Sequence, residues 1–258
     1  MKQRKNIGLT ALMDIAGLEE PPTPYHCGFI LGPRINAGGR VGKSDLGVRL
    51  LTTKDATEAH DLAQQLDALN KERKAIESNV QELALEQAER QQSSLIIAQG
   101  ENWHEGIIGI VAGRLKEKLN QPAAVISWND KDIGKASARS VKGIDLGGII
   151  IAARQAGLLI AGGGHAMAAG FSLKREHFND FCDFVETRIA KDLNQYKSAA
   201  ISEVEATLPL SAATIKLAES LEAAGPYGSG NPTPRFLLEN VTIISADKVG
   251  ANHLRCIF

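Results

Sequence analysis

The chain has 258 residues, of which 43% are hydrophobic and 23% charged, and its formal net charge is −1. These values are typical of a globular protein with more than one compact unit. No apolar run approaches the roughly 20 residues of a membrane span, and no apolar core follows the basic start at residues 1–6, which excludes a secretory signal. Three widely spaced cysteines, Cys27, Cys182 and Cys256, argue against a disulfide framework or zinc site. We therefore expect a cytoplasmic protein.

Charge is unevenly distributed along the chain. Residues 1–50 hold 7 Lys and Arg against 4 Asp and Glu, and residues 93–175 hold 10 against 6. Residues 54–92 and 176–258 each have an excess of acidic side chains. A local cationic field favours phosphate binding even in a chain that is neutral as a whole. The two positive blocks therefore favour anion binding.

The first 52 residues predict a helix fragment, a proline-rich break at residues 21–24, and a glycine-containing loop at residues 32–40. Arg34 and Arg40 flank this loop, and guanidinium forks suit phosphate oxygens. Asn36 adds a neutral donor between them. The alternative is an ordinary turn with solvated arginines.

The clearest helix runs over residues 54–92, where Thr52 and Asp55 predict a capping box. Apolar or aliphatic-stemmed side chains recur at spacings of three and four, a heptad pattern: Ala59, Leu62, Leu66, Leu69, Arg73, Ile76, Val80 and Leu83. Such a helix would be about 58 Å long. It is either a connector between two domains or a coiled-coil dimerisation arm.

Residues 93–195 alternate short apolar strands with helices, which indicates an α/β domain. Asp145 is placed to cap the second helix of this region. The predicted strands cover residues 95–98, 123–127, 133–139 and 168–173, and the predicted helices cover 106–119, 145–159 and 176–193.

The last segment predicts one more helix over residues 211–224, capped by Ser211 and stopped by a Gly-Pro pair. A loop rich in Gly and Pro follows, then a strand over residues 236–244 and the beginning of another at 253–258. Two strands are marginally stable by themselves.

The most informative stretch is Gly-Gly-Gly-His-Ala-Met-Ala-Ala-Gly at residues 162–170. Consecutive glycines weaken helices and strands, so they predict a tight loop. The backbone N–H groups of Gly163 and Gly164 are suited to cradle a phosphate, and His165 to donate to the same anion. The alternative is a tight turn with an incidental histidine.

Four further side chains are candidates for binding. Ser137 and Arg139 lie two apart on a predicted strand, so both point to one face and can reach a single phosphate. His104 precedes a helix and either caps it, which we prefer, or helps bind an anion. Trp103 either stacks on a base or sits in the core. No His and carboxylate cluster has ligand spacing, so we expect neither a metal site nor a catalytic residue in this chain.

Five segments carry a resemblance to a known family. Residues 162–173 resemble the Gly-Gly-Gly-His signature of the DHHA1 domain, the substrate-binding half of DHH-family phosphoesterases. Four more segments resemble its RecJ branch, which comprises single-stranded-DNA-specific exonucleases. Residues 32–40 resemble the close of the DHH domain, and residues 103–112 the opening of DHHA1. Residues 137–140 resemble a phosphate-contacting strand end, and residues 228–234 the linker before an OB-fold. The family's Asp-His-His motif lies upstream, and this sequence contains none.

The resemblance implies an α/β fold in which a long connector helix precedes a DHHA1-type domain, with the start of an OB-fold at the C-terminus. It also favours the connector over the dimerisation arm, so we expect a monomer. The implied parts are the tail of a DHH domain (residues 1–52), the connector helix (53–92), the DHHA1 domain (93–195), a linker with a helix (196–234) and a truncated OB-fold (235–258).

By the same resemblance, the parent is a metal-dependent 5′→3′ exonuclease of recombination and repair, and this chain is its substrate-binding, inactive C-terminal part. Mn²⁺ or Mg²⁺ would be held by the missing domain, with none in this chain. Ser137 and Arg139 would bind the 5′-phosphate end, Arg34 and His165 would contact phosphate, and Asn36 and Arg40 would hold their loop.

The implied partners are single-stranded DNA and a single-strand-binding protein or helicase, with no membrane. Two alternatives stay open: a DHH phosphodiesterase acting on oligoribonucleotides or cyclic dinucleotides, and a non-catalytic nucleic-acid-binding module.

Overall fold

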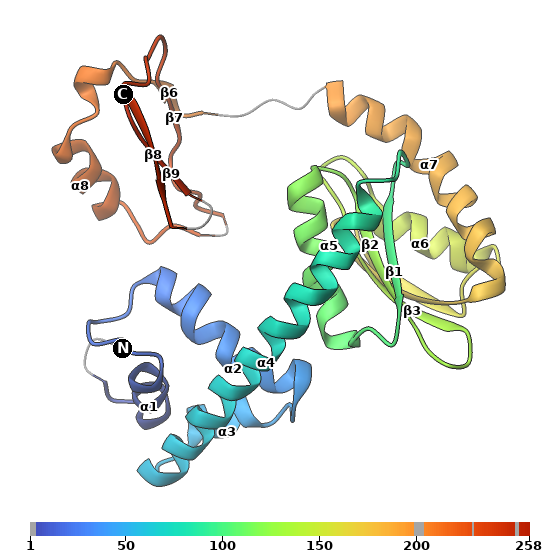
Figure 1. The fold of residues 1–258 in the computed structure, drawn as a ribbon, viewed down its shortest axis with the longest axis horizontal. Coiled ribbons are helices and arrows are strands. Elements are labelled where there is room, and N and C mark those ends of the chain that lie inside the picture. Colours follow the sequence, from blue (N-terminus) through green and yellow to red (C-terminus); the bar gives the residue numbers. More distant parts are fainter. Residues whose placement is uncertain (1–3, 199–203, 229, 251–252) are drawn as a thin grey trace. The chain divides into compact units, whose positions relative to one another are not determined.

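The computed structural model describes residues 4–198, 204–228, 230–250 and 253–258. Contacts divide the chain into two compact units, Met1–Ala199 and Ala200–Phe258 (Figure 1). Within the described residues, no helix combines the length and apolarity needed to cross a membrane. The basic start at residues 1–3, residues 199–203 of the predicted linker, and Ser229 of the 228–234 segment lie outside the described residues.

The chain begins with short helices packed on the first half of a long one. These are α1 (Ile7–Ile15), the π-helix η1 (His26–Leu31), α2 (Gly32–Val41) and α3 (Leu46–Thr52), which share an apolar core with α4 (Ala56–Ala88). The predicted loop at residues 32–40 is therefore wrong. Pro33 fits the first turn of a helix, and Gly38 is needed because a Cβ there would lie 2.7 Å from the Lys43 carbonyl oxygen.

The long helix is confirmed, but its cap differs from the prediction. Asp55 alone is the N-cap and accepts from the Thr57 and Glu58 N–H groups, whereas the Thr52 hydroxyl donates back to the Val48 carbonyl. The heptad prediction also fails at Leu83, which is 41% exposed. A straight helix with 3.6 residues per turn drifts away from a heptad seam, so its buried side chains there include Val80, Ala84 and Ala88.

The buried side of α4 packs against α1 and α2 near one end and against α5 (Glu105–Leu119) and β1 (Ile96–Glu101) near the other. Helix α4 therefore joins the N-terminal helices to the sheet, and its role as a connector rather than a dimerisation arm stays a prediction.

A five-stranded sheet forms the body of the first unit, in the order β1, β2 (Ala123–Trp128), β3 (Ile133–Arg139), β5 (Ala168–Lys174) and β4 (Ala161–His165). Within this sheet, β1 and β2 are parallel and the other neighbouring strands are antiparallel. One core lies between α4, α5 and the sheet, and another lies under α6 (Leu146–Gln155) and α7 (Phe178–Ser198), after the short η2 (Arg175–His177) (Figure 1). Asp145 caps α6 as predicted, accepting from the Gly148 N–H at 3.1 Å.

The glycine run at residues 162–164 is part of a strand and not of the predicted loop. Residues 161–165 form the edge strand β4, paired with β5 and joined to it through Ala166 and Met167, so the predicted loop is wrong. A Cβ on Gly162 would lie 2.9 Å from Ile150 Cγ2, and a Cβ on Gly164 would clash with the Ala168 carbonyl oxygen. The glycines thus let β4 lie close to α6 and β5, whose packing outweighs the low strand preference of glycine.

The described residues of the second unit form short elements. These are β6 (Ala206–Thr207) parallel to β7 (Phe236–Leu237), η3 (Leu210–Ala212), α8 (Ile215–Ala223), and the antiparallel pair β8 (Ser245–Val249) and β9 (His253–Ile257).

Two predictions for the second unit fail. Ser211 lies in a 3₁₀ turn and does not cap α8; the Thr214 hydroxyl does, accepting from the Leu217 N–H at 3.2 Å. The predicted strand at residues 236–244 ends at Leu237, and Asn240 has a φ of 55° that breaks extended structure.

Candidate functional site

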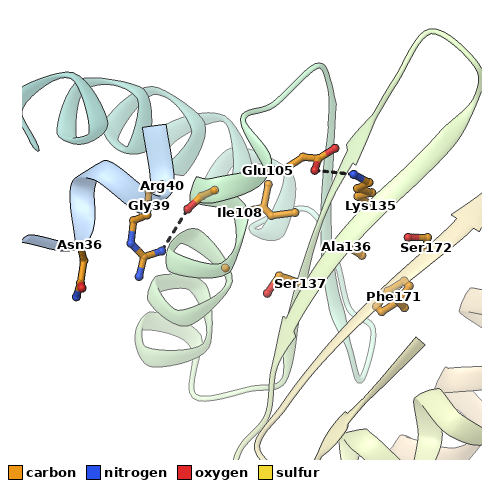
Figure 2. A pocket seen from close by; sticks show the side chains of 12 residues that line it. Asn36, Gly39, Arg40, Glu105, Ile108, Lys135, Ala136, Ser137, Phe171 and Ser172 are labelled. Atoms are coloured by element: carbon orange, nitrogen blue, oxygen red, sulfur yellow. Dashed lines mark hydrogen bonds and ion pairs between the residues drawn. The ribbon is translucent and has the colours of Figure 1, made fainter. Parts of the chain in front are cut away.

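A cleft of about 680 Å³ opens beside the sheet (Figure 2). It is lined by parts of α2, the first turns of α5, β3 and β5, which are far apart in the sequence. The lining residues are Asn36, Gly39, Arg40, Glu105, Gly106, Ile108, Gly109, Lys135, Ala136, Ser137, Phe171 and Ser172.

On the β3 side, Ser137 lines the cleft, and Arg139 of the predicted pair lies beside it on the same strand. Arg139 Nη1 donates to Ser137 Oγ at 3.0 Å and to the Ala138 carbonyl at 2.9 Å. Helix α5 comes so close that a Cβ on Gly109 would lie 3.0 Å from Ser137 Oγ and 3.1 Å from Arg139 Nη2. The hydroxyl and guanidinium therefore act as one preorganised group.

Arg40 enters from the other side, at the end of α2. Its Nη1 donates to the Gly106 carbonyl at 3.2 Å, and a Cβ on Gly106 would clash with the Arg40 carbonyl oxygen. A glycine in the first turn of α5 is thus required for α2 to approach (Figure 2).

The electrostatics of the cleft favour an anion. Burial, followed by the nearby positive charge of Arg40, lowers the pKa of Arg139 below its usual range, although the group stays charged at neutral pH. In the part of the chain that the structure describes, neither guanidinium forms an ion pair with a carboxylate. Two guanidinium groups that each lack a carboxylate partner would be stabilised by a phosphate, which guanidinium forks bind well.

An ion pair closes the rim. Lys135 Nζ lies 2.8 Å from Glu105 Oε2, and both side chains are about half exposed, at 55% each (Figure 2). An exposed pair of this kind contributes little stability. Lys135 is therefore free to exchange its carboxylate partner for a phosphate.

The strand register extends this surface towards His165. Arg139 pairs with Ala168, which pairs with His165, so the three side chains lie in one row on one face of the sheet. With neighbouring strands about 4.8 Å apart, the row spans about 10 Å. His165 Nδ1 accepts from the Met167 N–H at 3.3 Å, which leaves the ring proton on Nε2, available to an anion.

The next row consists of Ser137, Gly170 and Gly163. A Cβ on Gly163 would meet nothing within 4 Å, so this face is open above β4. Gly164 points to the opposite face, against Ala169. Because the run is a paired strand, it does not form the compact nest of N–H groups expected of a loop.

Arg34 stands apart from the cleft. Its Nε lies 2.8 Å from Asp67 Oδ1, its Nη1 donates to the Ile30 carbonyl at 2.9 Å, and its side chain is only 17% exposed. Burial would raise the pKa of Asp67, but hydrogen bonds from Lys71 and Arg34 outweigh it and lower that pKa. Arg34 thus locks α2 to α4, while Asn36 and Arg40, candidates for phosphate binding to which the resemblance gave a role in holding the loop, line the cleft.

Two weaker candidates have structural positions. Trp103 packs on the core of α4 and α5 and covers Gly100, so it is a packing residue in this structure. His104 is the N-cap of α5, as preferred from the sequence, and its Nδ1 accepts from the Gly106 N–H at 3.1 Å. Among the described residues, no group of three or more His, Cys, Asp or Glu side chains is placed to hold a metal.

Sequence reasoning missed several cleft residues. Lys135 carried a usable signal, since it lies two residues before Ser137 on the same strand face. Gly106 and Gly109 also carried a weak signal, because they lie one helical turn apart. Ser172 had none, because only the pairing of β5 with β3 brings it beside Lys135.

The family models agree with this architecture. The model for the DHHA1 domain matches residues 92–191, and the model for the RecJ OB domain matches residues 204–258, ahead of the predicted boundary at 235. The chain belongs to the RecJ family. Its fold is therefore a DHHA1-type α/β domain followed by an OB domain, as in solved RecJ structures.

Curated and solved relatives cover nearly the whole chain. The chain is 32% identical over 98% of its length to the single-stranded-DNA-specific exonuclease RecJ of Bacillus subtilis, and 34% identical over 96% to that of Dickeya dadantii. It covers 32% and 44% of those proteins. RecJ of Thermus thermophilus, solved with Mg²⁺ and also with Mn²⁺, matches with a TM-score of 0.79 and 29% identity, over 98% of this chain; the Mg²⁺ form is covered to 39%. The chain thus spans a third to under half of its RecJ relatives.

Proposed function

We propose that this RecJ-family chain is the substrate-binding part of a metal-dependent 5′→3′ exonuclease for single-stranded DNA in recombination and repair. One observation carries the proposal: Arg40 and Ser137 line one cleft, Arg139 is hydrogen-bonded to Ser137 and close enough for the charge of Arg40 to lower its pKa, and no carboxylate among the described residues pairs with either guanidinium. The ligand that fits this donor set is a phosphate, and the cleft would hold the one at the 5′ end of the strand.

The open face of the sheet gives the strand a path. From the cleft, the rows of β3, β5 and β4 lead over Gly170 and Gly163 to His165. Glycines without a Cβ in the way permit close approach of a sugar–phosphate backbone. The Nε2–H group of His165 would donate to a second phosphate along this path.

The metal chemistry is assigned outside this chain. Solved RecJ relatives contain Mg²⁺ or Mn²⁺, and two-metal hydrolysis requires clustered carboxylates and histidines. The described residues offer no such cluster. We therefore propose that the chain alone grips DNA without hydrolysing it.

The remaining assignments follow from this role. The proposed partners are single-stranded DNA and a single-strand-binding protein or helicase, with no membrane. The chain would act as a monomer, because α4 buries its apolar side within its own chain, and would work in the cytoplasm.

The test compares binding of an oligonucleotide with a 5′-phosphate and one with a 5′-hydroxyl by fluorescence anisotropy. We expect the phosphorylated strand to bind several-fold more tightly, and Arg40→Ala to abolish that preference. Arg90→Ala, which removes an exposed arginine away from the cleft, is the matched control. Equal affinity for both strands would refute the 5′-phosphate assignment.

Hydrolysis is tested separately, by incubating the pure chain and 5′-phosphorylated DNA with Mn²⁺ or Mg²⁺. We expect no release of nucleotides. Robust, metal-dependent digestion would show that the chain contains a catalytic centre of its own.

A further inference from the structure

The outer edge of the sheet at β1 is closed in an unusual way. An edge strand normally leaves a row of N–H and C=O groups open to other chains. Here the groups of Ile97 and Gln99 that point away from β2 are bound by two glutamine side chains, Gln87 in the last turn of α4 and Gln91 just after the helix. The groups at this edge are therefore paired, although among the described residues no strand lies beside β1 on this side.

Each glutamine makes two hydrogen bonds to one residue of β1. Gln87 Nε2 donates to the Gln99 carbonyl at 2.8 Å, and its Oε1 accepts from the Gln99 N–H at 2.9 Å. Gln91 repeats the pattern on Ile97, at 2.7 and 2.9 Å. A primary amide carries both a donor and an acceptor, as a peptide group does, so the two side chains stand in for a neighbouring strand.

Gln87 thus ties the last turn of α4 to the DHHA1 sheet, and Gln91, three residues beyond the end of the helix, ties the segment that follows it, with a further hydrogen bond back to the Gln87 carbonyl at 3.2 Å. The same helix holds α2 through the Arg34–Asp67 ion pair and through the close packing of Gly38 against Leu66. Helix α2 in turn carries Arg40 into the cleft. Residues of β1 and of α2 are thus connected through a single rigid helix.

The length of that helix makes its attachment sensitive. Twenty residues separate Asp67 from Gln87, which is about 30 Å of helix. A rotation of about 5° at the glutamine end would displace the α2 end by about 2–3 Å. Two-sided gripping of one phosphate by Arg40 and Arg139 tolerates only about 0.5 Å of misplacement.

We propose that Gln87 and Gln91 are positioning residues for the cleft: they fix α4 to β1, so that Arg40 stands opposite Ser137 and Arg139. The inference rests on the proposed binding of a strand phosphate. The glutamines touch no DNA and act only through the placement of Arg40.

The test is a double-mutant cycle on the full 258-residue chain, read as affinity for a 5′-phosphorylated oligonucleotide by fluorescence anisotropy. We expect Gln87→Ala with Gln91→Ala to weaken binding about five- to tenfold. In an Arg40→Ala background, the same change should weaken binding less than twofold, because there is no longer an arginine to misplace. Gln92→Ala is the matched control, since this exposed glutamine makes no hydrogen bond within the described residues.

Three results would overturn the inference. An equal loss in both backgrounds would show a general structural effect, and no loss would show that the attachment is irrelevant to the cleft. A rise in mass by light scattering, without loss of affinity in the monomer, would show that the glutamines only shield the β1 edge from pairing. If the double variant does not fold, Gln91→Glu, which keeps the acceptor and loses the donor, is carried through the same cycle.

The inference and the proposed function fail in different ways. Wild-type chain that does not bind the oligonucleotide refutes both. Wild-type chain that binds, with unchanged affinity in the folded glutamine variants, refutes the inference alone.

Discussion

Replacing Arg139 by alanine separates binding from stability. The side chain makes two hydrogen bonds, to Ser137 Oγ and to the Ala138 carbonyl, each contributing about 0.5–1.5 kcal/mol. Removing it also relieves its partial burial and its repulsion by Arg40, the causes that lower the pKa of Arg139. These effects oppose each other, so we expect the free energy of unfolding to change by less than about 1 kcal/mol, or about 2–4 °C in Tm.

Binding should respond much more strongly. A hydrogen bond to a charged group contributes about 1.5–3 kcal/mol, so the loss of one phosphate contact should weaken binding about 10- to 150-fold. The log–log salt slope should fall by about 0.7, one counterion on a single strand. Arg139→Lys keeps the charge without the fork, and should retain the salt slope while losing part of the affinity.

The assay is fluorescence anisotropy of a 5′-phosphorylated oligonucleotide over a range of salt, with thermal melting of the same samples. Arg90→Ala is the charge-matched control. An unchanged salt slope in Arg139→Ala would show that this guanidinium does not touch the DNA backbone. A large fall in Tm with unchanged affinity would assign Arg139 to the fold alone.

Three further predictions concern other residues. Gly164→Ala should destabilise the chain by about 1–3 kcal/mol because the added Cβ has no room. Gly163→Ala should leave Tm unchanged and weaken DNA binding, since its Cβ would lie on the open face. The reverse pattern would contradict the orientation of β4. His165→Ala should leave Tm nearly unchanged and reduce DNA affinity measured on the same sample, and wild-type affinity would remove His165 from the binding path. Because the pKa of Asp67 is lowered in the folded chain, its carboxylate stabilises the fold at pH values above its ordinary pKa of 3.8, and this contribution is lost as pH falls through the lowered pKa. Asp67→Asn should therefore cost stability at pH 7 and progressively less below about pH 4. A difference in Tm between wild type and this variant that is the same at pH 7 and pH 3 would contradict it.

Local patterns in the sequence determined most of the elements. The strand at residues 133–139 and the helix beginning after Asp145 follow from apolar runs, alternation and caps, which depend on neighbours within a few residues. Alternation also placed Ser137 and Arg139 on one face. The long helix was evident for the same reason, since its buried positions repeat with the helical period.

Only the tertiary structure decided the two glycine-containing segments and the partners of the arginines. Residues 32–40 and 161–165 read as loops because glycine disfavours regular structure, yet they form α2 and β4, where the absence of Cβ atoms allows backbones to approach. The local sequence does not distinguish Arg34 from Arg40, and the resemblance implied that Arg34 contacts phosphate. In the structure Arg34 instead pairs with Asp67, which is 33 residues away. Contacts of that range depend on how elements pack, and no local pattern encodes which carboxylate meets which guanidinium.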